Sequence, residues 1–230
     1  FLMRQGYAVA WVGWQVDVPR QDGLMALDAP RAPGISGFVR CRLRPNEAAE
    51  SLPLADRYHI PNACSNLDDP DASITVREHG GAPAVTLPRE GWRFTDAGHV
   101  SVKGGFKPGA IYDVVYRSAN PLVVGASFLA VRDTAAFLRW GTAAEGNPCE
   151  GGLNGAYLFG VSQSGRFLRE MLYLGLDEDK QGRMVFDAVW PHVAGGRRGE
   201  FNLRFGQSRQ PTWVMPSPEQ SATARRQSPL

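Results

Sequence analysis

The chain has 230 residues, of which 43% are hydrophobic and 21% are charged, proportions typical of a globular protein with a sizeable core. This composition excludes a fibrous protein and an intrinsically disordered one. The net charge is only +2 and lysines and arginines form no long run, so nothing in the charge predicts binding to nucleic acid or to an anionic membrane.

The N-terminal residues 1–12 predict the end of a helix, a stop at Gly6 and then a buried strand. Trp14 and Gln15 follow this strand. If the strand belongs to a parallel sheet, both residues lie at the carboxyl edge, where such sheets bind their ligands, and they are candidates for substrate binding. A polar loop with one buried tryptophan explains the same residues.

The pattern changes between residues 21 and 117 to short alternating runs separated by glycine and proline. Strands are predicted here, the clearest at 37–43, 73–77 and 110–116. No amphipathic stretch of helical length interrupts them, so an insertion of hairpins is favoured over further βαβ units. The histidines of this region are predicted to be surface or loop residues, because none has a matching acid in the sequence: His59, His79 and His99.

Helical periodicity returns at residues 126–140 and is followed by a glycine-containing loop at 141–155. An apolar, aromatic run at 156–159 predicts a buried strand, residues 166–174 predict a helix, and residues 184–190 predict another strand. Repeated alternation of this kind predicts a mostly parallel sheet with helices on its faces.

The segment Gly160-Val-Ser-Gln-Ser-Gly165 joins this strand to this helix, where a serine hydrolase holds its nucleophile on a sharp turn. The strained turn needs small residues two before and two after the nucleophile. Ser162 meets this requirement, whereas Ser164 would place Arg166 at the later position. Ser162 is therefore the predicted nucleophile, and the backbone N–H of Gln163 the predicted oxyanion donor. A serine-glycine turn without catalytic function is the alternative.

Beyond residue 207 the composition shifts to serine, proline, glutamine and arginine without either structural period. Residues 208–230 are predicted to be a disordered tail, and a departure from the original reading frame near Ser208 is the alternative.

Several motifs together resemble a bacterial α/β-hydrolase domain family with a Gly-x-Ser-Gln-Ser-Gly-Arg elbow. They lie at 6–15, 104–112 and 159–205, so the resemblance covers most of residues 1–207. It implies an α/β-hydrolase fold, with a discontinuous core at 1–20 and 118–207 and a β-rich insertion at 21–117. It also implies that the chain is incomplete at both ends, because strands usual in this fold are missing from it.

The same resemblance implies hydrolysis of an ester or a related acyl bond, with serine, acid and histidine in that order along the chain. His192 is the one histidine after Ser162 and so the candidate base, although it comes early for that role and a pocket-lining role is the alternative. Glu200 is the candidate acid, and a solvated carboxylate beside two arginines is its alternative. Asp187 lies near the start of its strand, at the wrong edge.

Neither a cofactor nor a metal is predicted, because Cys41, Cys64 and Cys149 are widely spaced and lack the pattern of a zinc site. No apolar run approaches the roughly 20 residues of a membrane span. The predicted partner is a small-molecule or polymer ester, and neither the compartment nor the oligomeric state follows from the sequence. A hydrolase-like fragment or binding scaffold without catalysis is the alternative function.

Overall fold

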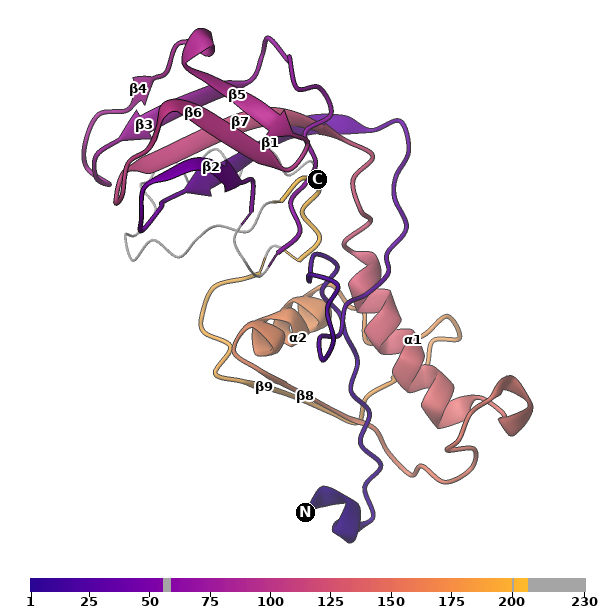
Figure 1. The fold of residues 1–230 in the computed structure, drawn as a ribbon. Helices are drawn as coiled ribbons and strands as arrows, with labels where there is room; N and C mark the ends of the chain where they lie inside the picture. The colour runs from indigo at the N-terminus through magenta and orange to yellow at the C-terminus, as the bar shows by residue number, and fades with distance from the viewer. Residues whose placement is uncertain (56–58, 200, 207–230) are drawn as a thin grey trace. The chain divides into compact units, whose positions relative to one another are not determined.

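The computed structural model describes residues 1–55, 59–199 and 201–206 (Figure 1). Two compact units divide these residues: the first joins Phe1–Ile35 to Asn120–Gly206, and the second is Ser36–Ala119. The candidate acid Glu200 and the tail predicted at 208–230 lie outside the described residues.

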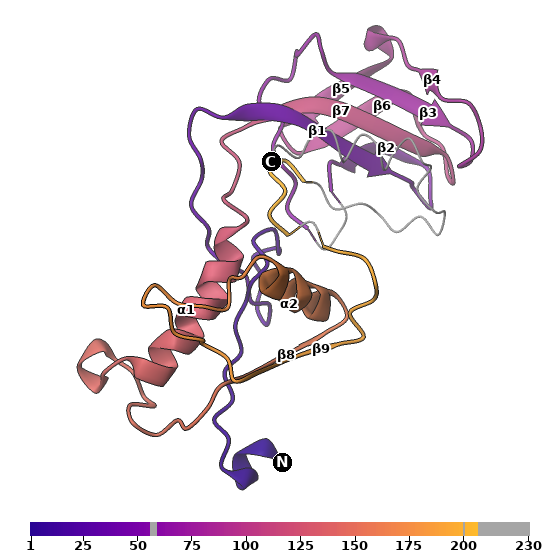
Figure 2. The same ribbon diagram turned by 180° about the vertical axis from the view of Figure 1, so that it is seen from behind.

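The first unit contains the serine motif between a strand and a helix, as the sequence predicts. Its elements are η1 (Leu2–Gln5), α1 (Ala126–Trp140), η3 (Ala143–Glu145), β8 (Tyr157–Val161), α2 (Gln163–Tyr173) and β9 (Ala188–His192). β8 and β9 pair in parallel, from Tyr157 opposite Ala188 to Val161 opposite His192. α2 packs against this pair, and both views place the helix beside the two strands (Figures 1 and 2). The predicted helix at 126–140 is confirmed with the same bounds.

The N-terminal segment departs from its prediction. A short 3₁₀ helix does end at Gly6, whose φ of 83° is the left-handed conformation of a helix stop. The buried strand expected next is wrong, because residues 7–12 pair with no strand of the described chain and the Trp11 side chain is 81% exposed. Apolar residues form a strand only where a neighbouring strand supplies hydrogen bonds, and no strand of the described residues lies beside this segment.

The last strand is also shifted from its prediction, which covered residues 184–190. Residues 184–187 instead form an irregular segment before the strand. Met184 forms an isolated antiparallel β-bridge with Glu178, and the Val185 N–H donates to the Asp177 carbonyl at 2.9 Å. β9 begins only at Ala188 and ends at His192. His192 is therefore the last residue of the strand rather than a residue beyond it.

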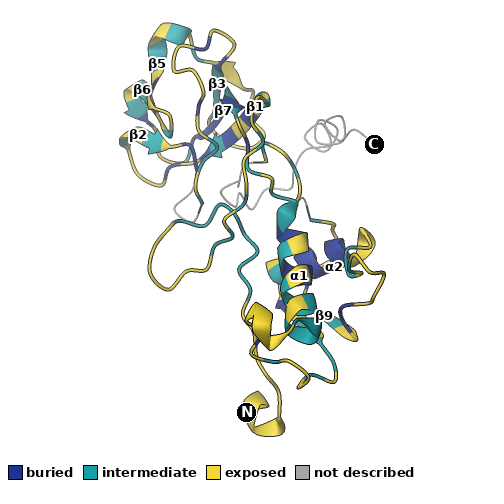
Figure 3. Cartoon of the chain, turned by 90° about the vertical axis from the view of Figure 1, so that its right-hand side faces the viewer, coloured by how far each residue is buried: buried dark blue, intermediate teal, exposed yellow. Residues whose placement is uncertain are grey.

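The core of the first unit lies where α1 and α2 meet. Phe128 of α1 stacks on Phe167 of α2, with ring centroids 4.5 Å apart, and Trp14 stacks on Phe167 at 4.6 Å. Val131, Leu168 and Met171 are buried in the same cluster, and Figure 3 shows the buried residues of both helices in dark blue. Burial of each such apolar side chain stabilises the fold by about 1.5–3 kcal/mol. The packing of α1 on α2 therefore holds α2 in place, together with the serine motif at its N-terminal end.

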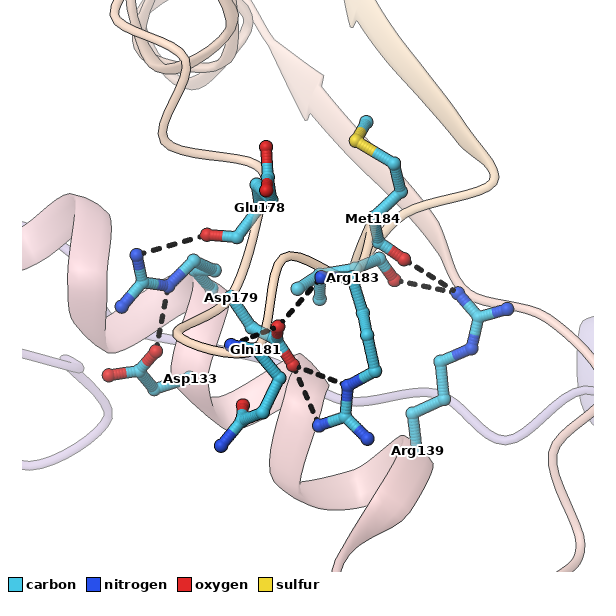
Figure 4. Close-up of polar contacts among 9 residues, drawn as sticks. Asp133, Arg139, Glu178, Asp179, Gln181, Arg183 and Met184 are labelled. Carbon is cyan, nitrogen blue, oxygen red and sulfur yellow. Dashed lines mark hydrogen bonds and ion pairs between the residues drawn. The ribbon is translucent and has the colours of Figure 1, made fainter.

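Polar contacts hold the loop between α2 and β9 against α1 (Figure 4). Arg132 donates to the Glu178 carbonyl at 3.1 Å, and Arg139 donates to the Val185 carbonyl at 2.9 Å. Within the loop, the Asp179 carboxylate accepts hydrogen bonds from the backbone N–H of Gln181 and of Arg183. α1 therefore positions the approach to β9 as well as the core.

The second unit consists of antiparallel sheets, in agreement with the strands predicted there. Its elements are β1 (Ser36–Leu43), β2 (Ala49–Pro53), β3 (Ser73–Arg77), β4 (Val85–Thr86), η2 (Arg89–Gly91), β5 (Trp92–Asp96), β6 (His99–Phe106) and β7 (Ile111–Ala119). They form one sheet in the order β1-β7-β3-β4 and another in the order β2-β6-β5. Among the strands described, only β8 and β9 are parallel, so a mostly parallel sheet is not confirmed.

Aromatic contacts join the two sheets of the second unit. Phe94 of β5 lies 5.7 Å from Tyr116 of β7, and Phe106 of β6 lies 4.8 Å from Tyr112 of β7, between ring centroids. Alternate residues of β1 and β7 point into this core, and the other face of the four-stranded sheet carries arginines and Asp113 together with apolar residues such as Phe38 and Val115. Cys41 and Cys64 are buried thiols, and Cys149 is a half-buried one. No helix in the described part of the chain is long and apolar enough to cross a membrane.

Candidate active site

Ser162 has a backbone conformation that is rare for a residue with a side chain. It lies between Val161, the last residue of β8, and Gln163, the first of α2, with φ 55° and ψ −110°. Non-glycine residues with positive φ are uncommon, and this region costs on the order of 1–3 kcal/mol. The Ser162 side chain does not cap α2 and is exposed. Among the described residues, the Ser162 hydroxyl therefore makes no capping contact that would explain the strain.

Two glycines allow the sharp turn around Ser162. A Cβ atom on Gly160 would lie 2.8 Å from the backbone carbon of Ser164, and one on Gly165 would lie 2.7 Å from the carbonyl oxygen of His192. Real Cβ atoms essentially never come so close to backbone atoms. The close packing of strand end and helix start therefore requires glycine at both positions.

Ser164 is held by a side-chain contact that Ser162 lacks. The indole N–H of Trp14 donates to the Ser164 hydroxyl at 3.2 Å, while the Trp14 ring lies on Phe167. Of the two predicted substrate-binding residues, Trp14 thus packs against α2 beside the turn. The Gln15 side chain donates from Nε2 to the Asp17 carboxylate at 2.9 Å, and the backbone carbonyl of Gln15 accepts the Leu27 N–H.

Gln163 begins α2, so its backbone N–H has no acceptor one turn earlier within the helix. The N–H groups of a first turn carry partial positive charge and stabilise anions placed before them. This is the position that oxyanion stabilisation requires for a nucleophile at Ser162.

His192 meets the serine turn through its backbone. Its carbonyl accepts the Ser162 N–H at 2.9 Å, whereas its ring lies 6.3 Å from the ring of Phe159, nearly parallel to it. In the described part of the chain the imidazole makes no hydrogen bond, so the structure brings the two residues together without joining their side chains. The next residue, Val193, also has a positive φ, of 45°. Two strained residues thus lie at neighbouring strand ends, a feature that clusters at functional sites.

Asp187 lies at the amino end of β9, the opposite end from Ser162. Its carboxylate accepts the Ala156 N–H at 2.7 Å and pairs with Arg139 at 3.0 Å. These contacts hold the pKa of the Asp187 carboxyl below its ordinary value, the hydrogen bond from Ala156 having the largest effect. Asp187 therefore stabilises the start of β9 and is not close to the serine turn.

α2 carries a buried ion pair that was not predicted from the sequence. Glu170 is only 4% exposed, and its carboxylate accepts two hydrogen bonds from Arg198, one of 3.0 Å from Nε. Arg169 also donates to the Gly195 carbonyl, so α2 holds the loop that follows β9. The signal was available, because Glu170 falls at helical spacing among Phe167 and Met171, on the apolar side of the helix, where a carboxylate needs a partner.

His99, one of the three earlier histidines, has an acid partner in the structure. His99 is an exposed residue at the start of β6, and its Nδ1 lies 3.0 Å from the Asp96 carboxylate. This contact lowers the pKa of Asp96. The expectation that these histidines lack a matching acid is therefore wrong for His99, because the β5–β6 turn brings together residues of adjacent strands.

No group of three His, Cys, Asp or Glu side chains is placed to hold a metal ion within the ranges described. The family model for the "Alpha/beta hydrolase domain" matches residues 77–227, which include the serine turn. No curated protein and no solved structure matches the chain.

Proposed function

The chain belongs to the α/β-hydrolase domain family, and on this basis we propose that it is a serine hydrolase that cleaves a carboxylic ester or a related acyl bond. The observation that carries the proposal is the strained backbone of Ser162 between β8 and α2. A side chain held at such a cost in an exposed turn is explained by nucleophilic attack on a bound substrate.

The proposed reaction has two steps. The Ser162 oxygen attacks the acyl carbon while a base takes its proton, and the N–H of Gln163 donates to the oxyanion that forms. The alcohol then leaves with that proton, and a water molecule activated by the same base releases the acid from the acyl-enzyme. His192 is the proposed base, and Glu200 the acid that orients it.

For His192 to act in this way, its imidazole must leave the ring of Phe159 and turn toward the Ser162 hydroxyl. Because the Ser162 N–H donates to the His192 carbonyl, the backbone from which the imidazole extends lies next to the serine turn. Trp14 and Gln15 are the proposed substrate-binding residues, and Trp14 is the better supported because it packs on the first turns of α2.

We assign the core of the hydrolase, with its parallel sheet, to residues 1–20 and 118–207, and a β-rich insertion to residues 21–117. The parallel β8–β9 pair and the antiparallel strands of Ser36–Ala119 support this division. The substrate is a small molecule or a polymer with an accessible ester.

Labelling with a fluorophosphonate probe tests the nucleophile. We expect the parent protein to be labelled and Ser162→Ala to be inert, whereas Ser164→Ala should still react because its hydroxyl is bound by Trp14. Peptide mapping of the labelled protein should locate the adduct on Ser162. An unlabelled parent protein, or equal labelling of the parent and Ser162→Ala, would contradict the proposal.

A hydrolase-like scaffold without turnover is the second candidate, and the position of the His192 ring favours it. Rates of p-nitrophenyl ester hydrolysis by the parent and by His192→Ala separate the two functions. A fall of about 10²-fold or more in the variant supports His192 as a general base. Turnover that is absent in both proteins supports the scaffold.

A further inference from the structure

The outer face of the four-stranded sheet carries an arginine cluster in the middle of the second unit. β7 lies between β1 and β3, as Figure 1 shows, and Asp113 of β7 is directly opposite Arg42 of β1. Arg40 and Arg42 lie two residues apart and so on one face, which Arg77 of β3 shares from the other side. We define the arginine cluster as Arg40, Arg42 and Arg77 around Asp113.

All three guanidinium groups converge on the single carboxylate. Arg42 forms a two-pronged contact with Asp113 at 2.7 and 3.0 Å, and Arg40 adds a hydrogen bond of 3.0 Å. Arg77 contributes a longer one of 3.4 Å. The Asp113 side chain is 3% exposed because these arginines cover it, whereas 41% of the Arg40 side chain reaches solvent. Asp113 thus holds the three cations together at the surface.

The charges of the cluster do not balance. Of the carboxylates in the described residues, only Asp113 pairs with any of the three arginines, so the cluster has three positive charges and one negative charge. The hydrogen bonds from Arg42 and Arg40 overcome the effect of burial and keep the pKa of Asp113 low, so this carboxyl is ionised at neutral pH. The net charge of the cluster is therefore +2, three positive charges less one negative, which would be neutralised by an anion with two negative charges.

Arg77 is the least satisfied member. Its Nε is buried and has no hydrogen-bond partner within the described chain, and its contact with Asp113 is the longest of the cluster. A buried donor without a partner costs stability and calls for an explanation. An acceptor group bound at the cluster would give Arg77 the hydrogen-bond partner that its Nε lacks among the described residues.

We propose that the arginine cluster binds a phosphate group. Planar guanidinium groups bind phosphate through paired hydrogen bonds, and three of them held by one carboxylate form a preorganised site for a tetrahedral dianion. Arg40 is the accessible contact, Arg77 supplies unused donors, and Asp113 positions both. The ligand is inorganic phosphate or a phosphate monoester. This site is independent of the chemistry proposed at Ser162.

Titration calorimetry of the full chain at constant ionic strength tests the site, with inorganic phosphate, phenyl phosphate and succinate as separate probes. We expect saturable binding of phosphate and weaker binding of succinate. Arg40→Gln and Arg77→Gln should each weaken phosphate binding about tenfold or more, as expected for loss of a charge-assisted hydrogen bond. Binding of phenyl phosphate would identify an ester as the ligand, and binding of inorganic phosphate alone would identify the free ion.

Arg93→Gln is the matched control, because Arg93 is an exposed arginine on β5, in the other sheet of the same unit. It should bind phosphate like the parent, as should Ser162→Ala. Circular dichroism shows whether each variant is folded, and Arg40→Lys, which keeps the charge, should lose less affinity than Arg40→Gln. Absence of saturable binding, or an equal loss in Arg93→Gln, would overturn the proposal.

Discussion

The amide nitrogen of Ser162 lies 2.9 Å from the carbonyl oxygen of His192, and this hydrogen bond extends the β8–β9 ladder into the serine turn. The same carbonyl is the nearest atom to a Cβ built on Gly165. The His192 carbonyl at the end of β9 thus contacts the turn at both Ser162 and Gly165. The conformation of Ser162 therefore depends on β9 as well as on the residues of the turn.

The glycine requirement gives the first prediction. Gly165→Ala and Gly160→Ala should each destabilise the protein by about 1–3 kcal/mol, because a methyl group at either position overlaps backbone atoms that cannot move aside. Urea unfolding followed by circular dichroism measures the loss.

Gly196→Ala is the control for both variants. Gly196 lies in the loop after β9, and no heavy atom lies within 4 Å of a Cβ built there. The free energy of unfolding of Gly196→Ala should differ from that of the parent protein by less than about 0.5 kcal/mol. A Gly165→Ala protein as stable as the parent would show that the end of β9 is not packed against α2 as described.

Replacement of the nucleophile by glycine should stabilise the chain. Ser162→Gly relieves a strain of about 1–3 kcal/mol, offset by about 0.5–1 kcal/mol of greater chain entropy in the unfolded state. We expect a net gain of about 1 kcal/mol in urea unfolding together with loss of probe labelling. Ser162→Ala retains a Cβ and should abolish labelling without this gain. Equal stability of the two variants would argue against strain at Ser162.

Local patterns in the sequence predict the elements around the site well. The helical period of residues 126–140 returns as α1, and a strand, turn and helix surround Ser162. The apolar side of α1 is buried as its period predicts, but the prediction that the strand before Ser162 is buried is wrong, because Tyr157, Phe159 and Val161 of β8 are exposed in the structure. The run at 7–12 has equally apolar residues but no paired strand, and pairing depends on chain elements that a local pattern does not contain.

The site is less predictable than the fold because side-chain contacts arise between distant residues. The small residues around Ser162 identify the nucleophile, but the contact of Trp14 with Ser164 joins positions 150 residues apart. The same is true of the position of the His192 ring, which lies beside Phe159 of the neighbouring strand. Only the carboxylate of Glu170 on an apolar helix face signals a distant partner in advance.

The contact between Trp14 and Ser164 yields a prediction on coupling. Trp14→Phe keeps a ring to stack on Phe167 but removes the indole N–H, and Ser164→Ala removes its acceptor. A double-mutant cycle should give a coupling energy of about 0.5–1.5 kcal/mol for this hydrogen bond. Additive losses would mean that the two side chains do not interact in solution.

The last prediction concerns the acid stability of the second unit. Asp113→Asn removes the charge that holds Arg40, Arg42 and Arg77 together, and breaking such a buried contact costs about 3–5 kcal/mol at pH 7. Burial alone would raise the pKa of Asp113, but the hydrogen bonds and charges of Arg42 and Arg40 together outweigh it and lower this pKa in the folded state. A carboxyl with a lowered folded pKa stabilises the protein fully above its unfolded pKa of about 3.9 and loses this contribution as the pH falls through the folded value.

The difference in unfolding free energy between the parent and Asp113→Asn should therefore be constant from about pH 7 to pH 5 and shrink below about pH 4. Urea unfolding at a series of pH values measures it. Asp71→Asn is the control, since the Asp71 side chain is 63% exposed in its pair with Arg117 and such surface pairs contribute about 0–1 kcal/mol. A difference for Asp113→Asn that grew toward low pH would require a raised folded pKa and would contradict the arrangement of the three arginines around this carboxylate.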